Sequence, residues 1–114
     1  MDRRLDERHA ANLDITVTDI AAPDQSAAGK IVDISQSGVC ADLPLPFTTG
    51  VTVKAQIGDC VLFGHVTYCN YVEGPTFRTG IEVVRVLIGE SDLSRLVNAI
   101  LAESLPATPG VRVN

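Results

Sequence analysis

The organisation of the chain is easiest to deduce from the stretch KIVDISQSGVCADL, residues 30–43. Two short apolar alternations, at residues 30–34 and 38–41, flank a run of small polar residues, a pattern that predicts two strands joined by a hairpin turn. An ordinary turn does not require Asp33 and Ser35, which lie two positions apart on the incoming strand. Because alternate residues of a strand share one face, these two side chains point to the same side. They either bond to the backbone of the turn or bind something else.

The same alternation recurs on both sides of this hairpin and predicts further strands. These segments are residues 13–17, 51–57, 61–71 and 77–86. With the hairpin they make about six strands, spaced roughly ten residues apart, which predicts an all-β fold, a small antiparallel barrel or sandwich. The chain has no strand–helix–strand rhythm, so a parallel sheet is not expected.

Near the C-terminal end, GESDLSRLVNAILAESLP predicts a helix over about residues 91–105. Its apolar residues recur at i, i+3, i+4, i+7 and i+8, which places them in one stripe. They are Leu93, Leu96, Val97, Ile100 and Leu101. Ser91 is a good N-cap, and Pro106 prevents the helix from continuing into the tail, residues 106–114. We expect the stripe to cover one mouth or flank of the barrel, with a dimer interface as the alternative.

Composition and charge limit the classes of function. The 114 residues suit a single domain, and no apolar run approaches the ~20 residues that span a bilayer. The net charge of −5 argues against binding to DNA or RNA, which depends on neutralising phosphates. The first residues, MDRRLDERHAAN, are too charged for a secretory signal peptide, so a cytoplasmic location without membrane insertion is expected.

The three cysteines, Cys40, Cys60 and Cys69, show no CxxC spacing, and their odd number indicates free thiols among apolar neighbours. His65 and Cys69 are conceivable as metal ligands, or as a nucleophile with its base. The chain has only two histidines, however, and no second ligand pair has the spacing of a tetrahedral site. We therefore expect no metal, no cofactor and no catalytic residue, with a Cys–His enzyme as the least favoured class.

A second group of polar residues lies in the N-terminal arm, residues 1–12, which we expect to be flexible. Its RRLDER sequence carries Arg3 beside Arg4, with Arg8 four positions after Arg4. On a helical turn Arg4 and Arg8 share a face and can converge on one anion. In an extended chain they reach out on the same side, roughly 13 Å apart. Neighbouring acids cancel any nonselective attraction, so anion binding must be local.

Together the two elements resemble the signature of the PilZ domain, a family of bacterial receptors for the second messenger cyclic di-GMP. The RxxxR of Arg4 and Arg8 is followed, 25 positions after Arg8, by the DxSxxG of residues 33–38. The family's penultimate hairpin is similar to GHVTYCNYVEGPTFRTGIEV, residues 64–83. The resemblance covers nearly the whole chain and implies a six-stranded antiparallel β-barrel followed by a C-terminal helix, over residues 13–105.

The resemblance implies that cyclic di-GMP is clamped between the arm and the hairpin. Arg4 and Arg8 would contact its phosphates and the Hoogsteen edges of its guanines. Asp33 would accept hydrogen bonds from the N1–H and N2–H₂ groups of a guanine, Ser35 would add a polar contact, and Gly38 would keep the turn tight. These roles suit the chemistry, because arginine offers a planar fork to phosphate or guanine and a carboxylate matches two parallel donors.

Two further residues are candidates for the same site. The resemblance implies that Arg3, an extra basic residue before the RxxxR, goes with binding of a stacked pair of ligand molecules. Tyr68, on a strand near the expected site, can stack on a base. The alternative for Tyr68 is a barrel-wall residue with its hydroxyl in solvent.

The expected function is a receptor that passes a signal to a downstream protein, as a monomer or a homodimer. We expect the arm to be mobile in the free protein and to fold against the barrel when its arginines hold the ligand. The runner-up function is a PilZ-like protein-interaction adaptor, for example in pilus assembly or motility, that binds no nucleotide. Such relatives usually lack the arginine pair or the DxSxxG, whereas this chain has both.

Overall fold

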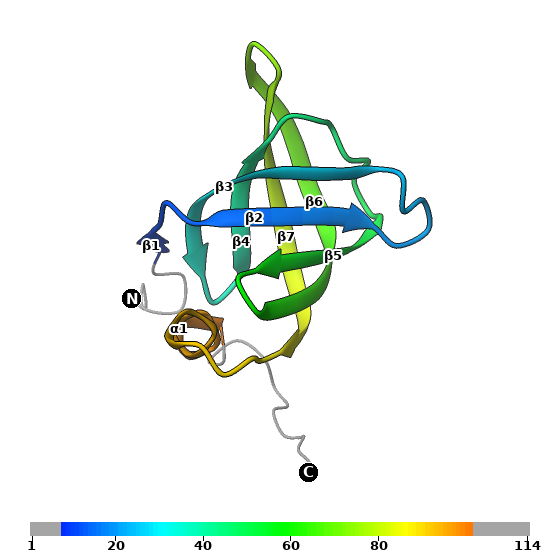
Figure 1. Cartoon of the computed structure of the whole chain (residues 1–114). Coiled ribbons are helices and arrows are strands. Elements are labelled where there is room, and N and C mark those ends of the chain that lie inside the picture. Colours follow the sequence, from blue (N-terminus) through cyan, green and yellow to red (C-terminus); the bar gives the residue numbers. More distant parts are fainter. Residues whose placement is uncertain (1–7, 102–114) are drawn as a thin grey trace.

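The computed structural model describes the backbone of residues 8–101 and the side chains of residues 11–101. Within this part of the chain, six antiparallel strands close into a barrel (Figure 1). They are β2 (Asp14–Asp19), β3 (Ser26–Ser35), β4 (Gly38–Leu43), β5 (Thr52–Ile57), β6 (Cys60–Glu73) and β7 (Thr76–Leu87). The strand order is β3-β2-β5-β6-β7-β4, and pairing between β3 and β4 closes the barrel. The predicted six-stranded antiparallel β-barrel is therefore confirmed.

The interior of the barrel is filled by the apolar halves of the alternating strands. In β5, Val53, Ala55 and Ile57 are buried, whereas Lys54 and Gln56 are exposed. The same alternation along β2 buries Ile15 and Val17 and leaves Asp14 and Thr16 exposed. Because side chains from every strand meet inside, a small barrel of this kind has a packed core and no channel.

A short additional strand, β1 (Arg8–Ala10), lies on the edge of β3 beyond the point where β2 pairs with it. Arg8 is opposite Ser35 and Ala10 is opposite Asp33. These three residues fall within the segment predicted as an arm. The arginines at positions 3 and 4 lie outside the described residues.

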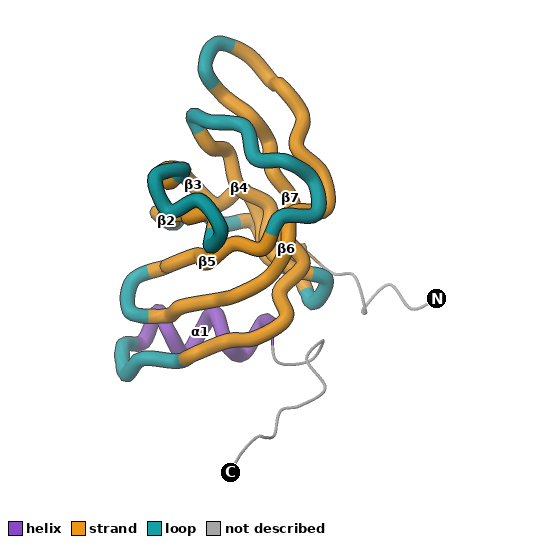
Figure 2. The backbone as a smooth tube through the Cα atoms, turned by 90° about the vertical axis from the view of Figure 1, so that its right-hand side faces the viewer, coloured by secondary structure: helices purple, strands orange, loops and turns teal. Residues whose placement is uncertain are grey.

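Helix α1 (Asp92–Leu101) lies at one end of the barrel, opposite the tip of the β6–β7 hairpin (Figures 1 and 2). The rest of the predicted helix, residues 102–105, lies outside the described residues. Ser91 is its N-cap, as predicted, and its Oγ accepts a hydrogen bond from the backbone N–H of Ser94 at 3.0 Å. In the described part of the chain, no helix is long and apolar enough to cross a membrane.

The buried face of α1 differs from the predicted stripe at one position. Val97 and Leu101 are fully buried, but Leu96 is 54% exposed. Ser94 is buried instead, and its hydroxyl accepts the backbone N–H of Gly89 at 2.8 Å. Leu96 lies roughly 130° around the helix from the mean direction of the buried residues, because successive residues are about 100° apart. The expectation that Leu96 joins the covered stripe is therefore wrong.

The β5–β6 turn holds the start of this helix. Asp59 Oδ2 accepts hydrogen bonds from the backbone N–H groups of Glu90 at 2.8 Å and Ser91 at 3.0 Å. Asp59 Oδ1 accepts one from the Ser91 hydroxyl at 2.5 Å. These bonds, those from Ser91 above all, favour the ionised carboxylate and lower the pKa of Asp59 to about 2. The helix is thus fastened to the barrel at its N-terminal end by one side chain.

Candidate functional site

A hollow on the outer wall of the barrel brings together the predicted site residues that the structure describes. Strands β3, β4, β6 and β7 line it, and its volume is about 340 Å³ including the solvent that it faces. Asp33, Ser35, Gly38 and Tyr68 are all among its lining residues. Because much of this volume is open solvent, the hollow is a shallow depression and not an enclosed pocket. It suits one planar group with the rest of the molecule outside.

Asp33 faces this hollow because of a β-bulge in β3. Ile31 and Ile34 are each only 1% exposed, although strict alternation would bury residues two apart. The pairing with β4 passes from Ile31 to Asp33 and skips Val32. The additional residue reverses the parity of the strand, so Asp33 comes to lie opposite Cys40 on the outer face. Without the bulge, its carboxylate would be directed into the core.

A second bulge has the same effect on Tyr68. Val66 is 1% exposed and faces the core, so simple alternation would bury Tyr68 as well. The pairing with β7 skips Thr67, whose hydroxyl donates to the carbonyl oxygen of Gly80 at 3.2 Å. Tyr68 is therefore turned outwards, whereas Cys69 is directed inwards to Thr79.

The turn after Asp33 is built by the two other residues of the DxSxxG. Ser35 is 5% exposed, and its Oγ accepts the backbone N–H of Ser37 at 3.1 Å. Gly38 has φ +141°, and a Cβ at this position would overlap the carbonyl oxygen of Ile81 in β7. Only glycine combines this backbone conformation with so close an approach of two strands. Both residues therefore set the shape of the hollow.

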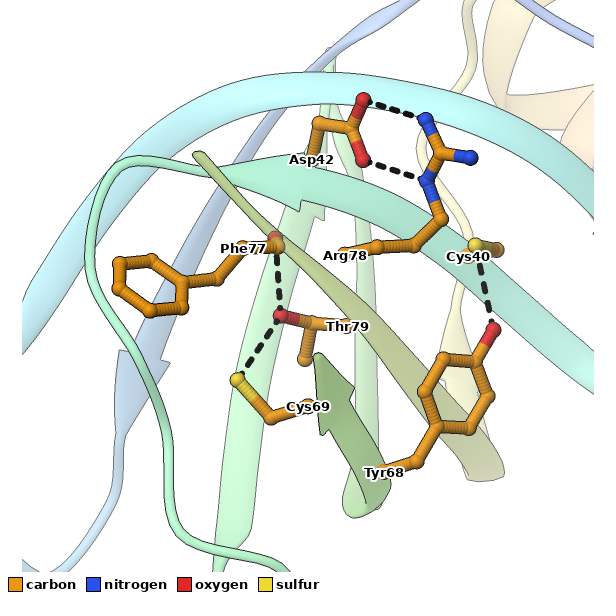
Figure 3. Close-up of polar contacts among 7 residues, drawn as sticks. All are labelled: Cys40, Asp42, Tyr68, Cys69, Phe77, Arg78 and Thr79. Atoms are coloured by element: carbon orange, nitrogen blue, oxygen red, sulfur yellow. Dashed lines mark hydrogen bonds and ion pairs between the residues drawn. The ribbon is translucent and has the colours of Figure 1, made fainter. Parts of the chain in front are cut away.

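The Tyr68 ring lies across three strands on the outer face (Figure 3). It covers Gly80, its partner in β7, and a Cβ added to Gly80 would overlap the ring. Its hydroxyl donates to Sγ of Cys40, in β4, at 3.3 Å. Cys40 is 6% exposed, and this burial raises the pKa of its thiol. The thiol is therefore protonated and unreactive at neutral pH.

Sequence reasoning did not assign Cys40 or Gly80 to the site. Cys40 was interpreted as a small buried hydrophobe, and its low exposure agrees with that interpretation. The available signal was Gly80 itself, because a glycine inside a strand often marks a close approach of other groups. Its partner could not be identified without the register of β6 against β7.

An ion pair flanks the hollow on the same face. Arg78 is two positions before Gly80 on β7, and Asp42 is two positions after Cys40 on β4. Arg78 and Asp42 lie opposite each other in the pairing of the two strands. Nε and Nη2 of Arg78 donate to the two carboxylate oxygens of Asp42 at 2.8 and 2.9 Å (Figure 3). The bidentate contact lowers the pKa of Asp42 and raises the pKa of Arg78. It links β4 to β7 beside the hollow.

The residues considered for metal or thiol chemistry have separate partners. His65 Nε2 lies 2.9 Å from Oε1 of Glu82, and Cys69 Sγ lies 3.6 Å from Oγ1 of Thr79. Among the described side chains, residues 11–101, no three metal-binding groups gather to hold an ion. The hollow combines a carboxylate, an aromatic ring and a tight turn, which together suit a planar heterocycle that carries hydrogen-bond donors.

No curated protein matches the chain. The family model described as PilZ domain matches residues 2–101, which include both motifs and all seven strands. This match covers most of the 114 residues. The chain therefore belongs to the PilZ domain family.

Proposed function

We propose that this protein is a cyclic di-GMP receptor that holds the messenger between its N-terminal RxxxR and the DxSxxG turn and signals to a partner protein. PilZ domains form a family of cyclic di-GMP receptors and adaptors. The observation that carries the proposal is the hollow, where Asp33, Ser35, Gly38 and Tyr68 meet. Strand β3, which lines the hollow, also pairs with strand β1, which begins at Arg8.

Asp33 is proposed to select guanine. Its outward carboxylate has two acceptor oxygens, which match the N1–H and N2–H₂ donors of one guanine edge. Adenine presents an acceptor at N1, so it would leave the carboxylate without its donors. A site built around such a pair discriminates strongly because the wrong base leaves charged oxygens unsatisfied.

The arginines are proposed to hold the rest of the ligand. The backbone of Arg8 is paired with that of Ser35, which lines the hollow, and neighbouring strands lie about 4.8 Å apart, so the last residue of the RxxxR lies in the strand next to it. Arg4 and Arg8 would contact phosphates and the Hoogsteen edges of guanine through charge-assisted bonds. Arg3 would supply the additional charge needed for a second, stacked ligand molecule.

Isothermal titration with cyclic di-GMP tests the proposal. The full chain is expected to bind, and Arg8→Ala should weaken binding at least tenfold, since a hydrogen bond to a charged group is worth about 1.5–3 kcal/mol. Arg85→Ala is the matched control, because it removes the same charge from an exposed position of β7 that does not line the hollow. It should bind like the unchanged protein.

Titration with cyclic di-AMP tests the role of Asp33. The unchanged protein should prefer cyclic di-GMP, and Asp33→Asn should reduce both the affinity and this preference. Equal affinity of the unchanged protein for the two nucleotides would contradict the role of Asp33. If cyclic di-GMP produces no heat at all, the proposal is wrong and the chain is the nucleotide-independent adaptor.

A further inference from the structure

The position of the Tyr68 ring is fixed from two sides. Below it, Gly80 has no side chain, and a Cβ there would overlap the Cδ2, Cε2 and Cζ atoms of the ring. At its far end, the hydroxyl donates to Cys40 Sγ at 3.3 Å. These two contacts hold the ring across the neighbouring strands β7 and β4.

We propose that Gly80 and Cys40 are positioning residues that make the Tyr68 ring a preformed stacking surface for one purine of the ligand. This inference rests on the proposed function and adds two residues outside the RxxxR and DxSxxG. Gly80 lets the ring settle against the sheet, and Cys40 fixes its direction. The ring and Asp33 both line the hollow, so the ring would meet the face of a base whose edge Asp33 holds.

The physical advantage is preorganisation. A side chain that is already immobilised loses little conformational freedom when a ligand binds. Tyr68 as a whole residue is 38% exposed although its contacts with Gly80 and Cys40 are made, so it remains accessible to a ligand. The thiol also suits its role, because Cys40 is nearly buried and stays protonated while the tyrosine hydroxyl donates to its sulfur.

Titrations of cyclic di-GMP into substituted full-length chains test this inference. Tyr68→Leu should weaken binding about 5- to 100-fold, as expected for loss of one base–aromatic stack. Gly80→Ala should approach the same loss, because the new methyl group displaces the ring. Gly74→Ala is the control for lost stability, since a Cβ at that hairpin glycine meets nothing within 4 Å and its positive φ of +51° strains the backbone without touching the ring. Cys40→Ser should retain most of the affinity because it keeps an acceptor, whereas Cys40→Val should not.

The decisive comparison is Gly80→Ala in the Tyr68→Leu background. If Gly80 acts through the ring, the second substitution causes no further loss. If Gly80→Ala merely damages the fold, it weakens binding equally in both backgrounds, and the inference is overturned. Unchanged affinity of Tyr68→Leu also overturns it while leaving the proposed function intact. Absence of binding by the unchanged protein overturns the proposed function and this role together.

Tyrosine fluorescence provides a second test, because the emission of Tyr68 would not change on ligand binding if its role were only structural. The chain has no tryptophan and two tyrosines, so Tyr71→Phe leaves Tyr68 as the single emitter. Its emission should be quenched on addition of cyclic di-GMP as a purine stacks on the ring. Emission that stays unchanged at saturating ligand, measured together with full binding heat, would contradict the inference.

Discussion

Gly38 is the residue on which the shape of the DxSxxG turn depends most. It combines φ +141° with contact against the carbonyl of Ile81, whereas Gly74 has φ +51° and open space around it. Gly74→Ala should cost about 1–2 kcal/mol, the ordinary penalty for a left-handed residue. Gly38→Ala should cost more, because the same kind of strain is joined by a backbone overlap.

Urea unfolding of the two variants measures this difference as a shift in the transition midpoint. A midpoint for Gly38→Ala at or above that of Gly74→Ala would show that the β4–β7 contact relaxes without cost. The difference between the variants measures the overlap together with the greater backbone strain of alanine at φ +141°, which lies outside the left-handed helical region that φ +51° occupies.

The sequence was most informative about the identity of individual site residues. The two motifs identified Asp33, Ser35 and Gly38, and the structure places all three around one hollow together with Tyr68. The contact of Tyr68 with Cys40 escaped prediction because the two residues are 28 positions apart. Such contacts depend on strand register, which local alternation does not determine.

At the scale of strands, the two bulges decide which residues can reach a ligand. A skipped residue at Val32 and another at Thr67 each reverse the alternation of their strand. The sequence around both positions predicts strands correctly, but an uninterrupted alternation would bury Asp33 and Tyr68. Bulges occur often beside functional sites, where they redirect a side chain without ending the strand.

The attachment of helix α1 depends on pH through Asp59. Its pKa is lowered from the ordinary 3.8 to about 2 by hydrogen bonds in the folded protein. The stabilisation is therefore complete above about pH 4 and is lost as the pH falls through 2. Asp59→Asn should lower the melting temperature at pH 6, and the difference from the unchanged protein should shrink between pH 4 and pH 2.

Thermal unfolding followed by circular dichroism at several pH values checks this expectation. Asp24→Asn, an exposed loop substitution, serves as the control for general effects of lost negative charge. A difference between the Asp59→Asn variant and the unchanged protein that stays constant from pH 6 to pH 2 would contradict the role given to this carboxylate.

At the scale of the whole molecule, the fold class, the strand count of the barrel and the terminal helix were predictable from periodicity and from the family resemblance. The rotation of α1 was not, because Ser94 is buried by a hydrogen bond to Gly89, whereas Leu96 remains exposed. Hydrophobicity alone ranks leucine above serine for burial. A specific polar contact reversed that order.

Amide hydrogen exchange measures which backbone amides become protected when the ligand binds. Addition of cyclic di-GMP should slow exchange in residues 2–12, if the arm folds against the barrel on binding as we propose. The amides of β5 (Thr52–Ile57), which does not line the hollow, should be unaffected. Equal protection of residues 2–12 with and without ligand would contradict a role for the arm in signalling, and Arg8→Ala should abolish the effect.

Strand β1 has a practical consequence for anyone who wishes to turn this domain into a biosensor. A fluorescent reporter fused ahead of the RxxxR would keep both arginines and would be joined to the barrel through the three paired residues of β1, beside Ser35 and Asp33. If the arginines hold the ligand as proposed, occupancy of the hollow should change the orientation of the attached fluorophore. A reporter fused after α1, whose described residues do not line the hollow, should respond far less.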